Sequence, residues 1–236
     1  MQERRVVNDT SLAGFFNRVY SVMGSGLLLT AAISYLLGTV FYNQYANFVA
    51  NHTFMFYILL FLPFFLSMGV NSRRAQANAG YAGLMFYLIS ACYGTTFTVI
   101  LIQYQSSIVA ISFLTTAVIF LTMSVVGRIT KQDLSRAGVI ATSALIGVIL
   151  LSVINFFMQS SGLQLILSYA ILVIFIVLTA FDTQKLKTIY MSANQEGGYV
   201  VNTNTLAIQG ALALYLDFLN IFLVVLRLFG GSSSRD

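Results

Sequence analysis

Two acidic residues, Asp182 and Asp217, fall within or at the end of long apolar stretches of the sequence. An ionisable residue inside a bilayer costs about 2.5–3.5 kcal/mol on insertion scales, so it marks a functional site by default. Two carboxylates that meet where the dielectric constant is low cannot both ionise cheaply, and they share a proton and titrate as a pair. Carboxylate oxygens are also the ligands that Ca²⁺ prefers. The two carboxylates therefore indicate a proton-controlled gate that can hold Ca²⁺ weakly and transiently.

Asp217 lies eleven residues into the last apolar run, which begins at Leu206, so it falls about halfway across a membrane. Its predicted helical face is a stripe of residues spaced three and four apart: Gln209, Ala213, Asp217, Asn220, Val224 and Arg227. A polar stripe on an apolar helix must face protein or water rather than lipid. We therefore expect the last span to lie inside the bundle, packed by the others.

Asp182 has two interpretations. Thr179 and Lys185 share its helical face at positions i−3 and i+3, so Asp182 can be a helix-end residue that reaches water or pairs with Lys185. If the helix continues to about Tyr190, Asp182 lies about two turns inside it and can approach Asp217 from the neighbouring antiparallel span. The spacing alone leaves both interpretations open.

The composition places these residues in a membrane protein. Of 236 residues, 58% are hydrophobic and 8% are charged, whereas a soluble domain carries about 25% charged residues. The net charge of +5 fits basic residues at the cytosolic ends of membrane helices. No basic stretch is interleaved with aromatic residues on a soluble face, which argues against a nucleic-acid partner. The partner implied by composition is the lipid bilayer.

Apolar runs long enough to cross a bilayer occur seven times, which predicts an all-α integral membrane protein with a seven-transmembrane helix bundle. The expected spans are 22–41, 54–70, 80–102, 108–126, 137–158, 163–187 and 206–229. We divide the chain into a cytosolic N-terminal tail (1–20), a membrane domain (21–230) and a short tail (231–236). The polar residues between 43 and 52 are expected to connect the first two spans.

Lys and Arg residues alternate between connections, which predicts the orientation. They occur in the N-terminal tail and in the second, fourth and sixth connections, namely Arg4, Arg5, Arg18, Arg73, Arg74, Arg128, Lys131, Arg136, Lys185 and Lys187, and not in the other three connections. The positive-inside rule then puts the N-terminus in the cytosol. Seven crossings put the C-terminus outside, whereas a re-entrant last segment would leave it in the cytosol.

Signatures of enzymes are missing from the sequence. It has no Gly-x-Ser-x-Gly nucleophile motif, no His-Glu-x-x-His zinc motif and no Walker lysine loop. The last span also has no lysine that could hold retinal. We expect a protein that is not an enzyme and needs no cofactor.

Two segments resemble the Bax inhibitor-1 (transmembrane Bax inhibitor motif) family, in its bacterial branch. They are Phe181-Asp-Thr-Gln184 and Ala211-Leu-Ala-Leu-Tyr-Leu-Asp-Phe-Leu-Asn-Ile-Phe222, and the seven-span layout extends the similarity over nearly the whole chain. The resemblance implies a central last helix wrapped by six others in a bacterial inner membrane. It also implies that Asp182 and Asp217 form a proton-sensitive pair tied to a cation leak, chiefly of Ca²⁺. Arg74, or Arg73 beside it, would pair with the aspartates.

Two functions follow from these observations. The first is a pH-sensitive calcium leak channel gated by the proton-sharing aspartates. The second is a non-conducting regulator, because the resemblance also implies a link to a membrane-anchored ATP-dependent protease. Leak-type relatives can carry an acid in the second span, and this chain has none between Phe54 and Val70. A secondary transporter is disfavoured, since neither an inverted repeat nor a pair of corresponding broken helices is visible.

Overall fold

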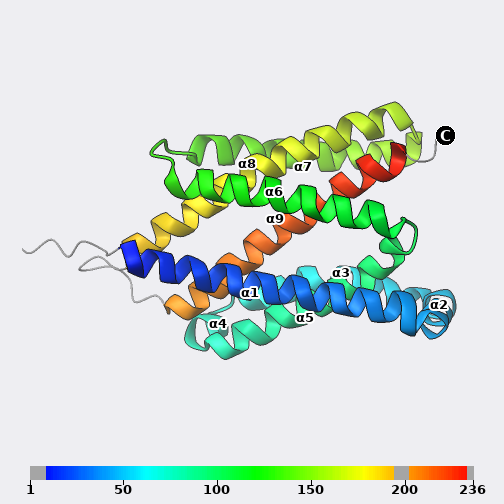
Figure 1. The fold of residues 1–236 in the computed structure, drawn as a ribbon, viewed down its shortest axis with the longest axis horizontal. Helices are drawn as coiled ribbons and strands as arrows, with labels where there is room; N and C mark the ends of the chain where they lie inside the picture. Colours follow the sequence, from blue (N-terminus) through cyan, green and yellow to red (C-terminus); the bar gives the residue numbers. More distant parts are fainter. Residues whose placement is uncertain (1–8, 194–201, 233–236) are drawn as a thin grey trace, which may run out of the picture. The chain divides into compact units, whose positions relative to one another are not determined.

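The structure, a computed structural model, describes residues 9–193 and 202–232 and is helical throughout these ranges apart from short connections (Figure 1). The helices are α1 (Asp9–Tyr35), the π-helix η1 (Leu36–Val40), α2 (Tyr42–Asn51), α3 (Thr53–Val70), α4 (Arg73–Ala77), α5 (Ala79–Leu101), α6 (Ser106–Ile129), α7 (Ser135–Met158), α8 (Ser161–Ala193) and α9 (Thr203–Ser232). The described residues contain no strand.

Seven helical segments are long and apolar enough to cross a membrane, which confirms the expected all-α membrane fold. They are Ser11–Val40, Thr53–Val70, Ala79–Leu101, Ser106–Ile129, Ser135–Met158, Ser161–Ala193 and Thr203–Gly231. In α9, 61% of the most apolar window is buried, against 44% or less in the other spans. The last span is thus the most enclosed of the seven, as its polar stripe predicted.

Two segments are more helical than the sequence indicated. Helix α1 begins at Asp9, so residues 9–20 of the expected tail are already helical. The expected polar connection between the first two spans contains α2, which turns Tyr45 into the protein. The Tyr45 hydroxyl donates a hydrogen bond to the carbonyl of Thr95, and burial raises the pKa of this tyrosine to about 12. The asparagines and glutamine of this segment occupy the outer face of an amphipathic helix rather than an open loop.

The chain forms two compact units. The first consists of residues 1–103 and 189–215, and the second of residues 104–188 and 216–236. In the first unit α5 packs along both α1 and α3. The Thr30 hydroxyl is hydrogen-bonded to the buried Tyr215 hydroxyl at 2.7 Å, which ties α1 to the first half of α9. Aromatic rings of α5, Phe86 and Tyr93, pack edge-on against the same Tyr215.

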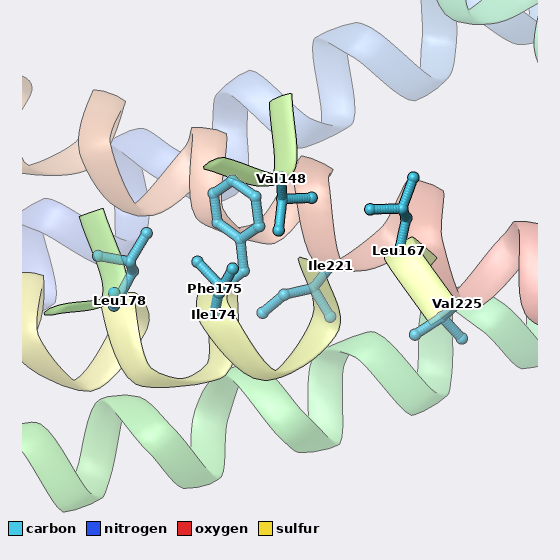
Figure 2. Packing of buried hydrophobic residues seen from close by; sticks show 8 residues of the cluster. Val148, Leu167, Ile174, Phe175, Leu178, Ile221 and Val225 are labelled. Carbon is cyan, nitrogen blue, oxygen red and sulfur yellow. The ribbon is translucent and has the colours of Figure 1, made fainter. Parts of the chain in front are cut away.

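In the second unit α7, α8 and the second half of α9 share one apolar core (Figure 2). Its buried members are Ala141, Val148, Leu167, Ile174, Phe175, Leu178, Ile221 and Val225. Helix α6 approaches α8 closely, because Gly127 lies against the backbone of Ala180 with no room for a side chain. Small residues allow this kind of helix contact in membranes. The contact lies two residues before Asp182, so it fixes the part of α8 that carries this carboxylate.

The close approach at Gly127 can be tested by adding one methyl group. A Cβ at this position would overlap the Ala180 carbonyl oxygen, so Gly127→Ala should destabilise the protein by about 1–3 kcal/mol. Gly147→Ala in α7 is the matched control, because nothing lies within 4 Å of its Cβ position. Thermal unfolding of the purified protein in detergent compares the two. Equal midpoints would contradict the close contact between α6 and α8.

Candidate functional site

Asp217 is a buried acid in the second unit. It is 5% exposed, and its Oδ2 atom has no hydrogen-bond partner in the part of the chain that the structure describes. The next residue, Phe218, packs edge-on against Phe113 and Phe120 of α6, with ring centroids 5.4 and 5.6 Å apart. These contacts fix the turn of α9 that carries the carboxylate. A carboxyl oxygen that is enclosed but unbonded is a costly feature unless it serves a purpose.

Asp182 is half-buried, and α8 continues past it to Ala193. Because α8 continues past Tyr190, Asp182 lies well inside the helix and not at its end. Lys185 does interact electrostatically with Asp182, but the two form no direct ion pair in the described residues. The Lys185 ammonium instead lies 5.8 Å from the centre of the Phe181 ring. Asp182 therefore lies inside α8 without a direct ion pair to Lys185 in the described residues, and its pairing with Asp217 stays a prediction.

Asp182 and Asp217 lie on two helices, α8 and α9, that share the apolar core of the second unit. Leu178 and Ile221 belong to this core, and Asp182 follows Leu178 by four residues while Asp217 precedes Ile221 by four. Residues four apart lie on the same face of a helix. Each carboxylate is therefore on a helical face that also contributes to the shared core. They are close enough to interact electrostatically.

Hydroxyl groups surround the α8 part of this site. The Thr183 hydroxyl donates to the Thr179 carbonyl at 2.8 Å and to the Ser124 hydroxyl of α6 at 3.4 Å. Thr179, Thr183 and Ser124 are all buried. A second buried hydroxyl on the same face of α6, Ser112, has no hydrogen-bond partner within the described ranges. The sequence patterns above predicted no role for these hydroxyls, although Thr179 and Thr183 are four residues apart in α8.

Gln184 holds the connection between α6 and α7 against α8. Its amide oxygen accepts from the Leu134 backbone N–H at 2.8 Å, and its amide nitrogen donates to the Gln132 carbonyl at 2.7 Å. The Lys187 ammonium donates to the Arg128 carbonyl at 2.8 Å and adds a third connection. In the Phe181–Gln184 segment, the aspartate is thus flanked by residues that fix its own helix. This role of the glutamine was missed because the segment was considered for its acid alone.

The other predicted site residues lie as follows. Asn220 donates from its amide to the Leu216 carbonyl within α9, at 2.8 Å. In the first unit, the Gln209 amide donates to the Val70 carbonyl at 3.1 Å, so it ties the start of α9 to the end of α3. Arg73 and Arg74 are exposed on α4, and the described residues give neither an ion pair. Their pairing with the aspartates stays a prediction.

The site does not have the composition of a permanent metal centre. No group of three or more His, Cys, Asp or Glu side chains that could hold a metal occurs in the described residues. Ca²⁺ normally takes six to eight oxygen ligands, and two carboxyl groups supply at most four. The arrangement can therefore attract a hard cation and release it again, and it can exchange a proton between two carboxyl groups.

Comparison with known proteins gives the family. A profile described as "Inhibitor of apoptosis-promoting Bax1" matches residues 12–234. The chain is 35% identical to the uncharacterized protein YrjE of Lactococcus lactis over the whole of both chains. It is 36% identical to the inner membrane protein YbhL of Escherichia coli K12, over 93% of this chain and 92% of that one. It is also 34% identical to an uncharacterized membrane protein of Streptococcus pyogenes serotype M1, over 94% and 95% of the two chains. With its seven apolar helices, the chain belongs to the Bax inhibitor-1 family of membrane proteins.

Proposed function

We propose that this protein is a pH-sensitive leak channel for Ca²⁺ in the bacterial plasma membrane, gated by the Asp182–Asp217 pair. The observation that carries the proposal is the enclosed Asp217 carboxyl, whose Oδ2 atom lacks a hydrogen-bond partner in the described residues while a second carboxyl interacts with it. A single shared proton satisfies both groups, because one carboxyl can then donate to the other.

Loss of that proton supplies the force that opens the gate. Two unit charges 4 Å apart repel by about 4 kcal/mol at an effective dielectric constant of 20. A shift of a two-state equilibrium from 1:99 to 99:1 needs about 5.5 kcal/mol. In this proposal, repulsion of this order pushes α8 away from α9 beside their shared core. Low pH favours the closed state, and higher pH favours the open one.

Ionisation also provides the attraction for the transported ion. The doubly ionised pair concentrates negative charge in a part of the membrane where a divalent cation has few other favourable positions. The small number of carboxyl oxygens keeps the residence of Ca²⁺ short. Weak binding is what a leak requires, since an ion must leave the site as readily as it enters. Ca²⁺ is in this proposal the transported ion and not a resident cofactor.

Neutralising either aspartate should remove the pH response of Ca²⁺ flux. In Asp217→Asn and Asp182→Asn, the remaining carboxyl has no partner to repel, so flux should change little between acid and alkaline pH. Flux is measured with a calcium dye in liposomes across a pH series. The matched control is Asp133→Asn, an exposed acid of the same unit. Hydrogen bonds from the Ser135 side chain and backbone lower the pKa of Asp133, and its charge has no contact with the pair.

The control should retain the full pH response of the unaltered protein. A wild-type response in both Asp182→Asn and Asp217→Asn would overturn the proposed gate.

The same assay tests the predicted pairing of Arg74 or Arg73 with the aspartates. A cation that supports ionisation of the pair is lost in Arg74→Gln, so flux should then rise only at a higher pH, whereas Arg73→Gln should have the smaller effect.

We further propose that the N-terminus lies in the cytosol and the C-terminus outside. The last span, Thr203–Gly231, has 29 residues, which extend about 43 Å as a helix. The hydrocarbon core is about 30 Å thick, so this helix is long enough for a full crossing. A re-entrant segment would have to turn back within that length.

A reporter fused after Asp236 tests the orientation. Alkaline phosphatase, which is active only outside the cytosol, should be active in this position, and a fluorescent protein that matures in the cytosol should remain dark. Fusions after Lys131, in the connection that carries Arg128 and Arg136, serve as the control and should give the opposite pattern. A bright C-terminal fluorescent fusion would contradict seven crossings.

A non-conducting regulator of a membrane-anchored ATP-dependent protease is the second candidate. The observation that favours it is α3, which carries no acid between Thr53 and Val70 and has Pro63 inside it. A cation path that requires an acid in this span would be missing from this protein. The regulator would act through a cytosolic segment and would conduct nothing when purified.

Removal of the N-terminal segment should separate the two candidates. The deletion must stop before Asp9, because Phe15 and Phe16 are buried and Phe15 stacks on Tyr190 with ring centroids 4.4 Å apart. The regulator predicts that deletion of residues 1–8 abolishes co-purification of a membrane protease with the tagged chain. Failure of the full-length chain to recover any such protease would count against the regulator.

A further inference from the structure

Two pockets lie on either side of Arg227, at the end of the second unit where α7 ends and α8 begins. Each has a volume of about 490 Å³, within the range of about 300–1,000 Å³ typical of ligand pockets. Arg227 and Gln164 line both of them. They are far from the aspartates, since Arg227 follows Asp217 by ten residues, or about 15 Å along the helix. The proposed gate makes no use of them.

Arg227 is the one charged residue that lines either pocket, and no acid is among their lining residues. Its side chain is exposed, and the described part of the chain supplies it with neither an ion pair nor a hydrogen bond. A guanidinium group offers five N–H donors in a planar fork that matches the oxygens of a carboxylate or phosphate. The charge of the pockets thus favours an anion.

Two amide side chains add hydrogen-bond donors beside the guanidinium. The Asn155 amide oxygen accepts from the Ser160 backbone N–H at 3.2 Å, so its NH₂ group remains available to the first pocket. The Gln164 side chain makes no hydrogen bond within the described residues. Donors from three helices, α7, α8 and α9, therefore surround the same space. Charge-assisted hydrogen bonds to an anion are about twice as strong as neutral ones.

The remaining lining combines serines and Gln159 with apolar and aromatic side chains. Phe156, in the first pocket, is 76% exposed, and Leu167 and Ile171 extend the same wall along α8. Tyr169, in the second pocket, is 55% exposed, and tyrosine is enriched where the bilayer meets water. With Asp217 near the middle of a core about 30 Å thick, Arg227 lies close to its edge. This is the level of the phospholipid phosphates.

We propose that these pockets bind an anionic phospholipid, with its phosphate on Arg227, Asn155 and Gln164 and its acyl chains along Phe156 and Ile171. The leaflet is the one on the side away from Lys185 and Lys187. The phosphate diester of the lipid supplies anionic oxygens that accept hydrogen bonds from these donors. The acyl chains of the lipid cover the exposed apolar side chains. The site is independent of the aspartate pair.

Native mass spectrometry of the full-length protein in detergent tests the assignment. The probes are phosphatidylglycerol, phosphatidylcholine and inorganic phosphate, each added to delipidated protein. Phosphatidylglycerol should be retained in preference to phosphatidylcholine, and Arg227→Gln should weaken its binding by about tenfold, as the loss of a charge-assisted hydrogen bond predicts. Arg227→Lys keeps the charge and should retain most of the binding. Lys131→Gln removes an equal charge from an exposed loop of the same unit and should bind as the unaltered protein does.

Three results would overturn the proposal. The first is equal binding of phosphatidylglycerol by Arg227→Gln and the unaltered protein, and the second is an equal loss in Lys131→Gln. The third is stabilisation by inorganic phosphate as large as that by phosphatidylglycerol, which would make the site one for free phosphate. If Arg227→Gln does not purify as a folded protein, Gln164→Leu decides in its place. It should weaken phosphatidylglycerol binding severalfold, and unchanged binding would overturn the proposal.

Discussion

The Asp217 carboxyl, enclosed in the last membrane helix, is the feature on which the proposed gate depends. A carboxyl that is 5% exposed, with one oxygen unbonded in the described residues, has little reason to persist in a membrane helix unless its proton is used. Its neighbour on α8 gives it a partner of the same kind. A pair of this type responds to pH through a change in charge, and its two carboxyls titrate as one unit.

The surrounding packing determines where that change in charge acts. Gly127 against Ala180 fixes α8 on α6 near Asp182, and Phe218 against Phe113 and Phe120 fixes α9 on α6 beside Asp217. The apolar core that contains Leu178 and Ile221 holds α8 and α9 together. Gln184 and Lys187 attach the next part of α8 to the connection between α6 and α7. Repulsion between the carboxylates therefore acts at a defined place and not along whole helices.

The sequence allowed the spans and Asp217 to be predicted because both depend on local composition. Long uncharged runs must cross the bilayer, and an acid in the middle of one stands out. The role of Asp182 could not be predicted in this way, because it depends on where α8 ends. The end of α8 in turn depends on contacts with α6 and with the connection between α6 and α7. The helix α2 was mistaken for a loop because amide side chains interrupt its apolar residues, although Tyr45 is buried and anchors it to α5. The pockets beside Arg227 arise where three helices meet, so no single segment of sequence contains them.

Infrared spectroscopy of the protonated carboxyl tests whether Asp182 and Asp217 share a proton. A pH titration of the purified protein in lipid should show a protonated carboxyl band that persists after the exposed acids have ionised. That band should be lost or shifted in both Asp182→Asn and Asp217→Asn, because the proton belongs to the pair. If the band were unaffected by Asp182→Asn, or if no carboxyl stayed protonated once the exposed acids had ionised, the two aspartates would not share a proton.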